Sequence, residues 1–214
     1  MKYLHWDQKI IADSSHHSVT EMYGHGYVFT RLGKGVMQQT RSVRIDLSRF
    51  KPSSENRRIL RKGESISIEH SAIPYADYTW EIGKIAKDFY GKKFGGAFSA
   101  NKIKELLTSD QNFNALLSFK EDGIAKGYAI CYETQNMLHY SYPFYELEAS
   151  PKDMGLIMMT KVLDESKERG LSYVYLGSLQ RPTDTYKLQF EGLEWFDGER
   201  WVDDIEKVKV ILSN

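Results

Sequence analysis

The feature that most constrains the fold is a long amphipathic segment between two strand-like runs. Residues 137–148 (MLHYSYPFYELE) are aromatic and apolar as a strand would be, and residues 171–178 (LSYVYLGS) are β-branched and aromatic. Between them we expect a helix that Ser150 opens, with Pro151 at its first position, Asp153 completing a capping box and Gly170 ending it. A strand, a helix and a strand within about thirty residues predict a β-α-β crossover, which makes its two strands parallel.

The segments before this crossover predict an antiparallel meander. Residues 113–120 and 125–133 are strand-like and are separated from each other and from residues 137–148 by the turn signals EDG and TQN. Helical periodicity appears in residues 75–90 and again in residues 100–107, with a GKKFGG loop between them. An α/β (α+β) chain with a mixed, mostly antiparallel sheet flanked by helices is therefore expected, an organisation like that of the GCN5-related N-acetyltransferase (GNAT) fold.

The first part of the chain has a different pattern. Its first 50 residues are Gly-rich and aromatic and predict strands and turns, and a short basic helix follows Pro52 and ends near Gly63. We expect residues 1–74 to form an amino-terminal region with this basic helix and residues 75–214 to form the GNAT-like domain. One continuous domain is the alternative.

Composition and charge limit the partners, the location and the kinds of site that we expect. The 29 basic residues balance 29 acidic ones, so binding to nucleic acid requires a local patch rather than a global field. Neither a signal peptide nor a membrane span is expected, and the single cysteine, Cys131, favours a reducing, cytoplasmic location. The six histidines lack the spacing of metal ligands, and we therefore predict no metal site.

Four segments resemble one enzyme family, in the same order. They are FKPSSENRRILRK, SYPFYELE, GLSYVYLGS and TYKLQFEGLEWFDGERW. Each is similar to a segment of the bacterial leucyl/arginyl-tRNA-protein transferases. The chain departs from the family by lacking its amino-terminal Cys-rich element, and Glu146 and Leu147 stand where the family has Asp and Pro.

This resemblance implies a GNAT-like transferase that uses aminoacyl-tRNA to add an amino acid to the amino-terminal amine of a protein, peptide or small amine. Its partners would be aminoacyl-tRNA and the acceptor, with no cofactor and no membrane. Two alternatives remain: an acyl-coenzyme A dependent N-acyltransferase that uses acetyl-coenzyme A, and a noncatalytic module that binds tRNA or peptide. The donated amino acid, the acceptor's amino-terminal residue and the oligomeric state stay open.

The loop before the long helix bears on the choice of donor. Acetyltransferases of this fold hold the coenzyme A pyrophosphate on free amides at the start of that helix. Here the loop is EASPKDMG, in which Pro151 lacks an amide hydrogen and Asp153 brings a negative charge to the same place. The sequence therefore disfavours coenzyme A.

Three residues are the candidates for catalysis. Glu146, at the end of the third meander strand, is expected to polarise the acceptor amine. Because the pKa of an α-amine is about 8, a carboxylate is a strong enough base for this step. A surface carboxylate at a strand end is the alternative interpretation. Tyr145 beside it could orient the amine or the ester, or be a core or rim tyrosine. Tyr186 lies in the last of the four matching segments.

Six residues are the candidates for binding substrate or tRNA: Arg44, Arg57, Arg58, Arg61, Lys187 and Gln189. Arg57, Arg58 and Arg61 lie on neighbouring faces of the basic helix, and such a run alone is more often a solvated surface than a nucleic-acid site. The resemblance makes Arg57 and Arg58 candidates for contact with tRNA phosphates or an acidic acceptor residue. Lys187 could neutralise an acidic acceptor or the terminal phosphates of tRNA, or be a solvated surface lysine. Arg44 could meet an acidic group or a phosphate, or be an outward-facing strand arginine without such a role. Gln189 could form a hydrogen bond with a substrate.

Overall fold

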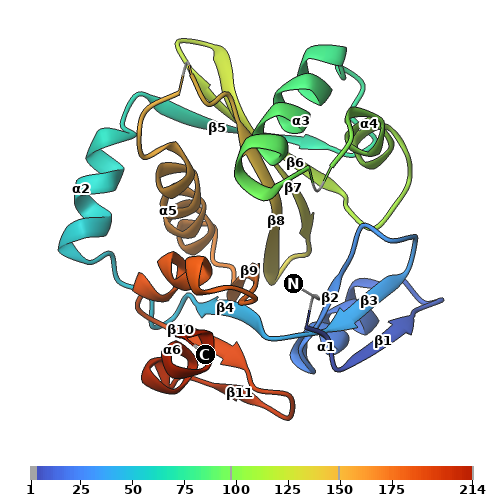
Figure 1. The fold of residues 1–214 in the computed structure, drawn as a ribbon, viewed down its shortest axis with the longest axis vertical. Coiled ribbons are helices and arrows are strands. Elements are labelled where there is room, and N and C mark those ends of the chain that lie inside the picture. Colours follow the sequence, from blue (N-terminus) through green and yellow to red (C-terminus); the bar gives the residue numbers. More distant parts are fainter. Residues whose placement is uncertain (1–3, 97, 149, 214) are drawn as a thin grey trace. The chain divides into compact units, whose positions relative to one another are not determined.

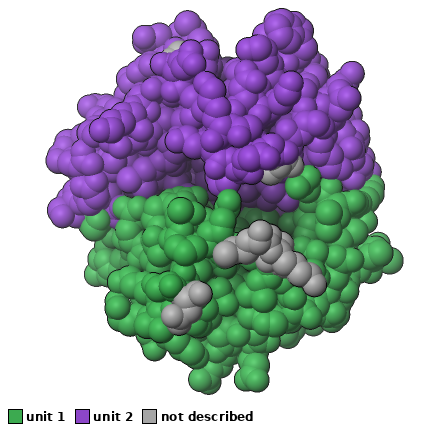
Figure 2. Space-filling model, viewed as in Figure 1, with its two compact units in different colours: residues 1–53, 134–139, 165–214 green, residues 54–133, 140–164 purple. Residues whose placement is uncertain are grey.

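The computed structural model describes residues 4–96, 98–148 and 150–213. It divides into two compact units, which Figure 2 shows in different colours. Unit 1 comprises residues 1–53, 134–139 and 165–214, and unit 2 comprises residues 54–133 and 140–164. Each unit is built from segments that alternate along the chain, so neither corresponds to residues 1–74 or 75–214.

Unit 1 combines a small sheet with four strands of a larger one. Its elements, seen in blue and in orange to red in Figure 1, are β1 (Asp7–Ile10), α1 (His16–Gly24), β2 (Tyr27–Phe29), β3 (Val36–Gln39), β4 (Ser42–Asp46), β9 (Tyr173–Ser178), η1 (Pro182–Gln189), β10 (Leu193–Phe196), β11 (Trp201–Val202) and α6 (Ile205–Ser213). The small sheet has the order β1-β3-β2. In β4, Val43 and Ile45 are fully buried while Arg44 between them is not, as the alternation of a strand requires.

Unit 2 contains the meander, three whole helices and most of a fourth. Its elements are α2 (Ser54–Lys62), β5 (Ile66–Ala72), α3 (Trp80–Phe94), α4 (Ala100–Thr108), β6 (Ala115–Glu121), β7 (Ile124–Glu133), most of β8 (Met137–Tyr145) and most of α5 (Met154–Glu168). The end of α2 packs directly against α5, because a Cβ atom on Gly63 would lie only 2.3 Å from Cγ2 of Ile157. Glycine at this position permits the close approach of the two helices.

The predicted fold class is confirmed. An eight-stranded sheet has the order β11-β10-β4-β9-β8-β7-β6-β5. Strands β5, β6 and β7 pair antiparallel, as do β9, β4, β10 and β11. Strands β8 and β9 pair parallel, with Met137 opposite Tyr173 and His139 opposite Tyr175, and α5 connects them. This is the crossover that the sequence predicts.

Three local predictions were wrong. The long helix begins at Met154 rather than near Ser150, whose hydroxyl donates to the Lys126 carbonyl instead. Helix α1 lies in a region that we expected to contain only strands and turns. Helix α3 continues to Phe94, through most of the expected GKKFGG loop.

Within the described part of the chain, every helix is too short or too polar to cross a bilayer.

Candidate active-site residues

The loop after β9 buries a lysine. Lys187, in η1, is only 9% exposed, and its Nζ donates to the Ser178 carbonyl at 2.9 Å. Asp184 fixes the loop, because its Oδ2 accepts from the backbone amides of Gln180 and Arg181 at 2.8 and 2.9 Å. Burial lowers the pKa of Lys187 from its ordinary 10.5 to about 8. The side chain is therefore an amine that can gain or lose a proton close to physiological pH.

A buried histidine lies on β8 in the same unit. His139 is 2% exposed, and its Nδ1 shares a hydrogen bond of 2.8 Å with the Tyr23 hydroxyl, which also accepts from the Phe29 amide at 3.3 Å. Burial lowers the pKa of His139 to about 3, and the positive charge of Lys187 acts in the same direction. The imidazole is thus neutral at physiological pH.

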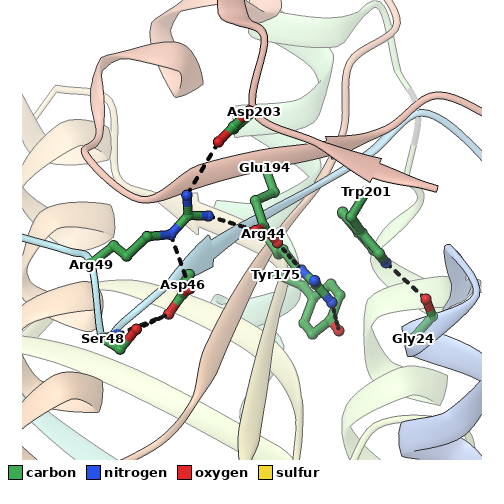
Figure 3. Close-up of polar contacts among 9 residues, drawn as sticks. All are labelled: Gly24, Arg44, Asp46, Ser48, Arg49, Tyr175, Glu194, Trp201 and Asp203. Carbon is green, nitrogen blue, oxygen red and sulfur yellow. Dashed lines mark hydrogen bonds and ion pairs between the residues drawn. The ribbon is translucent and has the colours of Figure 1, made fainter.

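Arg44 is held between two aromatic rings. Its guanidinium carbon lies 4.1 Å from the centre of the Tyr173 ring and 4.2 Å from that of Trp201. Its Nε donates to Glu194 at 2.7 Å and its Nη1 to the Tyr175 hydroxyl at 3.5 Å, as Figure 3 shows. These contacts join β4 to its neighbours β9 and β10.

A second arginine completes the same network. Arg49 donates to Glu194 at 2.5 Å, to Asp46 at 3.0 Å and to Asp203 at 3.3 Å (Figure 3). Glu194 therefore bridges Arg49 and Arg44. Because its guanidinium is both stacked and paired, Arg44 holds several strands of unit 1 together.

Two further predicted residues lie on η1 beside Lys187. Tyr186 is 48% exposed, and the Lys187 Nζ lies 5.8 Å from the centre of its ring. Gln189 is exposed, and its side-chain amide donates to the Tyr186 carbonyl at 2.6 Å. The predicted residues of the last matching segment thus all lie on η1, with the lysine side chain buried and the tyrosine side chain exposed.

Tyr145 and Glu146 end β8 in unit 2 and differ in environment. Tyr145 is half-buried, with its ring centre 4.8 Å from that of Phe89, and its ring lies against Gly155, where a Cβ atom would come within 3.4 Å of Cε1 of Tyr145. Burial raises the pKa of Tyr145, and the Gly155 amide partly opposes this effect. Glu146 is exposed, and its own backbone amide donates to the Lys126 carbonyl at 3.1 Å. Glu146 is thus open to solvent while Tyr145 contacts the first turn of α5.

The basic helix α2 carries positive charge that is partly neutralised. Arg58 donates to Glu55 one turn earlier, and Lys62 forms an ion pair with Asp153 just before α5. Arg57 and Arg61 are exposed. The predicted residues of unit 2 are therefore divided between α2 and the end of β8, and those of unit 1 between β4 and η1.

Comparison with known proteins adds a second line of information. No family model matches the chain. The aspartate/glutamate leucyltransferase of Chromobacterium violaceum is 26% identical over 169 residues, which cover 74% of this chain and 67% of that protein. The protein of the same name from Alkalilimnicola ehrlichii is 24% identical over 183 residues, 82% of this chain and 75% of that protein. The chain is similar to these leucyltransferases over most of its length. This similarity confirms the prediction of an aminoacyltransferase enzyme.

Solved structures agree with the fold class. L-PGS from Bacillus licheniformis superposes with a TM-score of 0.50 at 15% identity, over 77% of this chain and 50% of that one. This chain thus spans about half the length of that protein, and the match shows a shared fold.

Sequence reasoning missed the pair formed by His139 and Tyr23. Both side chains are buried, and the two residues are 116 positions apart in the chain. The available signal was weak: a histidine within the apolar run MLHYSY, where a neutral, hydrogen-bonded imidazole is the form that burial permits. Its partner was not recognisable from local pattern.

Proposed function

We propose that this chain transfers an amino acid from aminoacyl-tRNA to the α-amine at the amino terminus of a protein or peptide. Similarity to two proteins named aspartate/glutamate leucyltransferase supports this activity. It also leads us to propose leucine as the donated residue and amino-terminal Asp or Glu as the acceptor.

The observation that carries the choice of donor is the first turn of α5. In a coenzyme A dependent enzyme of this fold, the backbone amides there would have to receive a pyrophosphate. The Tyr145 ring instead lies against Gly155 in this turn, and the Asp153 carboxylate, held by Lys62, precedes the helix. A phosphate would have to displace a tyrosine and approach a carboxylate. The residues present do not fit coenzyme A in that position, and this favours the tRNA ester as donor.

The reaction needs few catalytic groups. The acceptor nitrogen attacks the ester carbonyl, a C–N bond forms, the bond from carbonyl carbon to ribose oxygen breaks, and the nitrogen's proton passes to a base while the ribose oxygen gains one. Glu146 is our first candidate for the base in unit 2, and Tyr145 next to it would orient the ester or the amine. In unit 1, Lys187 can also accept a proton in its neutral form, and Tyr186 and Gln189 would contact the substrate.

The arginines divide by their contacts. Arg57 and Arg61, exposed on α2, are proposed to meet tRNA phosphates or an acidic acceptor, and Arg58 would do so by exchanging its partner Glu55. Arg44 would act by holding β4, β9 and β10 in register rather than by direct contact with substrate.

A donor competition tests the proposal. The protein is incubated with an Asp-initiated peptide and either radiolabelled leucyl-tRNA or radiolabelled acetyl-coenzyme A, with a Gln-initiated peptide as the acceptor control. We expect label in the Asp peptide from leucyl-tRNA alone. Transfer only from acetyl-coenzyme A would refute the proposal, and tRNA binding without transfer from any donor would favour a noncatalytic module.

Separate variants test the two bases. If Glu146→Gln leaves kcat unchanged, Glu146 is not the base. If Lys187→Met leaves the pH profile of kcat/KM unchanged, Lys187 does not exchange a proton with the substrate.

A further inference from the structure

Helix α3 carries an exposed stripe that none of the proposed catalytic steps uses. Trp80, Lys87 and Phe94 are spaced by seven residues, so they lie almost directly above one another along the helix. Trp80 is 68% exposed and Phe94 is 40% exposed, and Lys87 between them is exposed. At 1.5 Å per residue the stripe is about 21 Å long.

Two residues fill the turns between these three. Lys84 follows Trp80 by one turn and is exposed, and Gly91 follows Lys87 by one turn. A Cβ atom on Gly91 would meet no atom within 4 Å, so the surface there is open. We call Trp80, Lys84, Lys87, Gly91 and Phe94 the α3 stripe. It places one aromatic ring at each end of a single helical face and two positive charges between them.

The surroundings of the stripe are also basic. Helices α3 and α4 lie side by side in Figure 1 and together hold six lysines against three acidic residues. The lysines are Lys84, Lys87, Lys92, Lys93, Lys102 and Lys104. Three of these six form ion pairs with described residues, with Asp88, Glu148 and Glu105 as partners, and Lys87, Lys93 and Lys104 have none within the described ranges. This part of a chain with zero net charge is therefore a local cationic surface.

The composition of the stripe fits a single-stranded nucleic acid. Lysines attract phosphates, and exposed aromatic rings are platforms on which unpaired bases stack. Trp80 makes no ring contact with any other described residue, so its faces are available to a ligand. An acidic protein would use the lysines but would have no particular need for an open tryptophan.

The carboxyl end of the stripe leads to a proposed site residue of the same unit. Phe94 contacts Phe89, with ring centres 6.0 Å apart, and Phe89 contacts Tyr145 at 4.8 Å. The Tyr90 hydroxyl donates to the Pro143 carbonyl at 2.9 Å, which fastens this end of α3 to β8. A strand lying along α3 would thus arrive at the end of β8, where Tyr145 is followed by Glu146.

We propose that the α3 stripe and the neighbouring lysines bind the single-stranded acceptor end of the tRNA donor and direct its aminoacylated 3′ terminus toward Tyr145. This inference rests on the proposed function, because it takes aminoacyl-tRNA as the donor.

Binding of deacylated leucine tRNA tests the surface without requiring transfer. The variant Lys84→Gln/Lys87→Gln should weaken binding and lower the slope of log affinity against log salt by about 1.4, because each lost phosphate contact on a single strand contributes about 0.7. Trp80→Ala should weaken binding roughly tenfold, and Trp80→Phe, which keeps a ring, should recover most of that loss. The matched control is Lys207→Gln/Lys209→Gln on α6, which removes the same charge from an exposed helix elsewhere and should not change the slope.

A second measurement links the surface to catalysis. The ratio of kcat/KM for leucyl-tRNA to kcat/KM for the minimal donor 3′-leucyl-adenosine should fall in the α3 variants, because only the longer donor reaches the stripe. Wild-type tRNA binding in both the lysine and the tryptophan variants would overturn the inference while leaving the proposed function intact.

Other occupants give different results. Equal loss of binding to polyglutamate and to tRNA would overturn the inference in favour of an acidic protein partner. A dimer that Trp80→Ala converts to monomer in sedimentation would overturn it in favour of a second copy of the chain. If acetyl-coenzyme A proves to be the donor while the variants still lose tRNA affinity, the proposed function fails and the RNA surface stands.

Discussion

The buried lysine of η1 gives a stability prediction whose sign is opposite to that of most core substitutions. A pKa of about 8 for Lys187, against 10.5 for an ordinary lysine, means that the folded protein holds this proton about 3 kcal/mol more weakly than the unfolded chain does. Replacing Lys187 by Met removes this penalty and keeps the length of the side chain. The substitution also removes the hydrogen bond to the Ser178 carbonyl, at a cost of about 1–2 kcal/mol. We expect Lys187→Met to raise the free energy of unfolding by about 1–2 kcal/mol at pH 7.

The dependence on pH identifies the cause. Below pH 8 both the folded and the unfolded states carry the proton, so the wild type bears the whole penalty there. Between pH 8 and 10.5 the folded state has lost the proton while the unfolded state keeps it, so wild-type stability rises with pH relative to the variant. The advantage of Lys187→Met should therefore shrink through this range, disappear near pH 9 and become a disadvantage of about 1–2 kcal/mol by pH 10.5.

Urea unfolding followed by tryptophan fluorescence at pH 7 and pH 10.5 measures the effect. Lys209→Met, at an exposed position of α6, is the control, and its difference from wild type should not depend on pH in this way. A variant that is less stable than wild type by the same amount at both pH values would refute the reasoning, because burial of the ammonium would then carry no cost. Loss of transfer activity in the stabilised variant would indicate that the lysine is kept for function.

Three further predictions concern other parts of the molecule. Arg44→Lys should lower the free energy of unfolding by about 2 kcal/mol, because an ammonium cannot stack flat on two rings; an unchanged urea midpoint would contradict this. Gly63→Ala should cost about 2–3 kcal/mol because the new methyl would overlap Cγ2 of Ile157, and Ile157→Leu in the same chain, which removes that methyl, should restore part of the thermal stability. His139 resists protonation when folded, so the free energy of unfolding should fall as pH drops from 6.5, by about 3 kcal/mol at pH 4. His139→Gln should remove that component from the acid unfolding curve, and an identical curve would show that the imidazole does not govern it.

The parts of the fold that could be predicted are those that local pattern determines. Strands β6, β7 and β8 alternate with clear turn signals, and the crossover helix is bounded by Gly170, so the sheet class was accessible from sequence. The start of α5 was not, because the Asp153 carboxylate, which the local pattern assigns to a capping box, pairs instead with Lys62, 91 residues earlier in the chain. Local rules cannot weigh a partner at that distance.

The candidate site was predictable in its residue types more than in its environments. The segment around Lys187 was identified from sequence, but its burial depends on how Asp184 and Gln180 fold the loop. Helix α1 was missed because only Val19 and Tyr23 on it are buried, which leaves too few apolar positions for a periodic signal.

The position of β4 has a consequence for how the protein is made. Its Arg44 bonds residues on the two flanking strands that lie 131 and 150 positions later in the chain, in β9 and β10. During synthesis, β4 must therefore leave the ribosome and remain without sheet neighbours until nearly the whole chain has emerged, whereas β5, β6 and β7 can pair soon after they are made. Unit 1 can close only at the end of translation, so a ribosome that stalls after β7 would display an exposed strand edge to any chaperone or protease nearby.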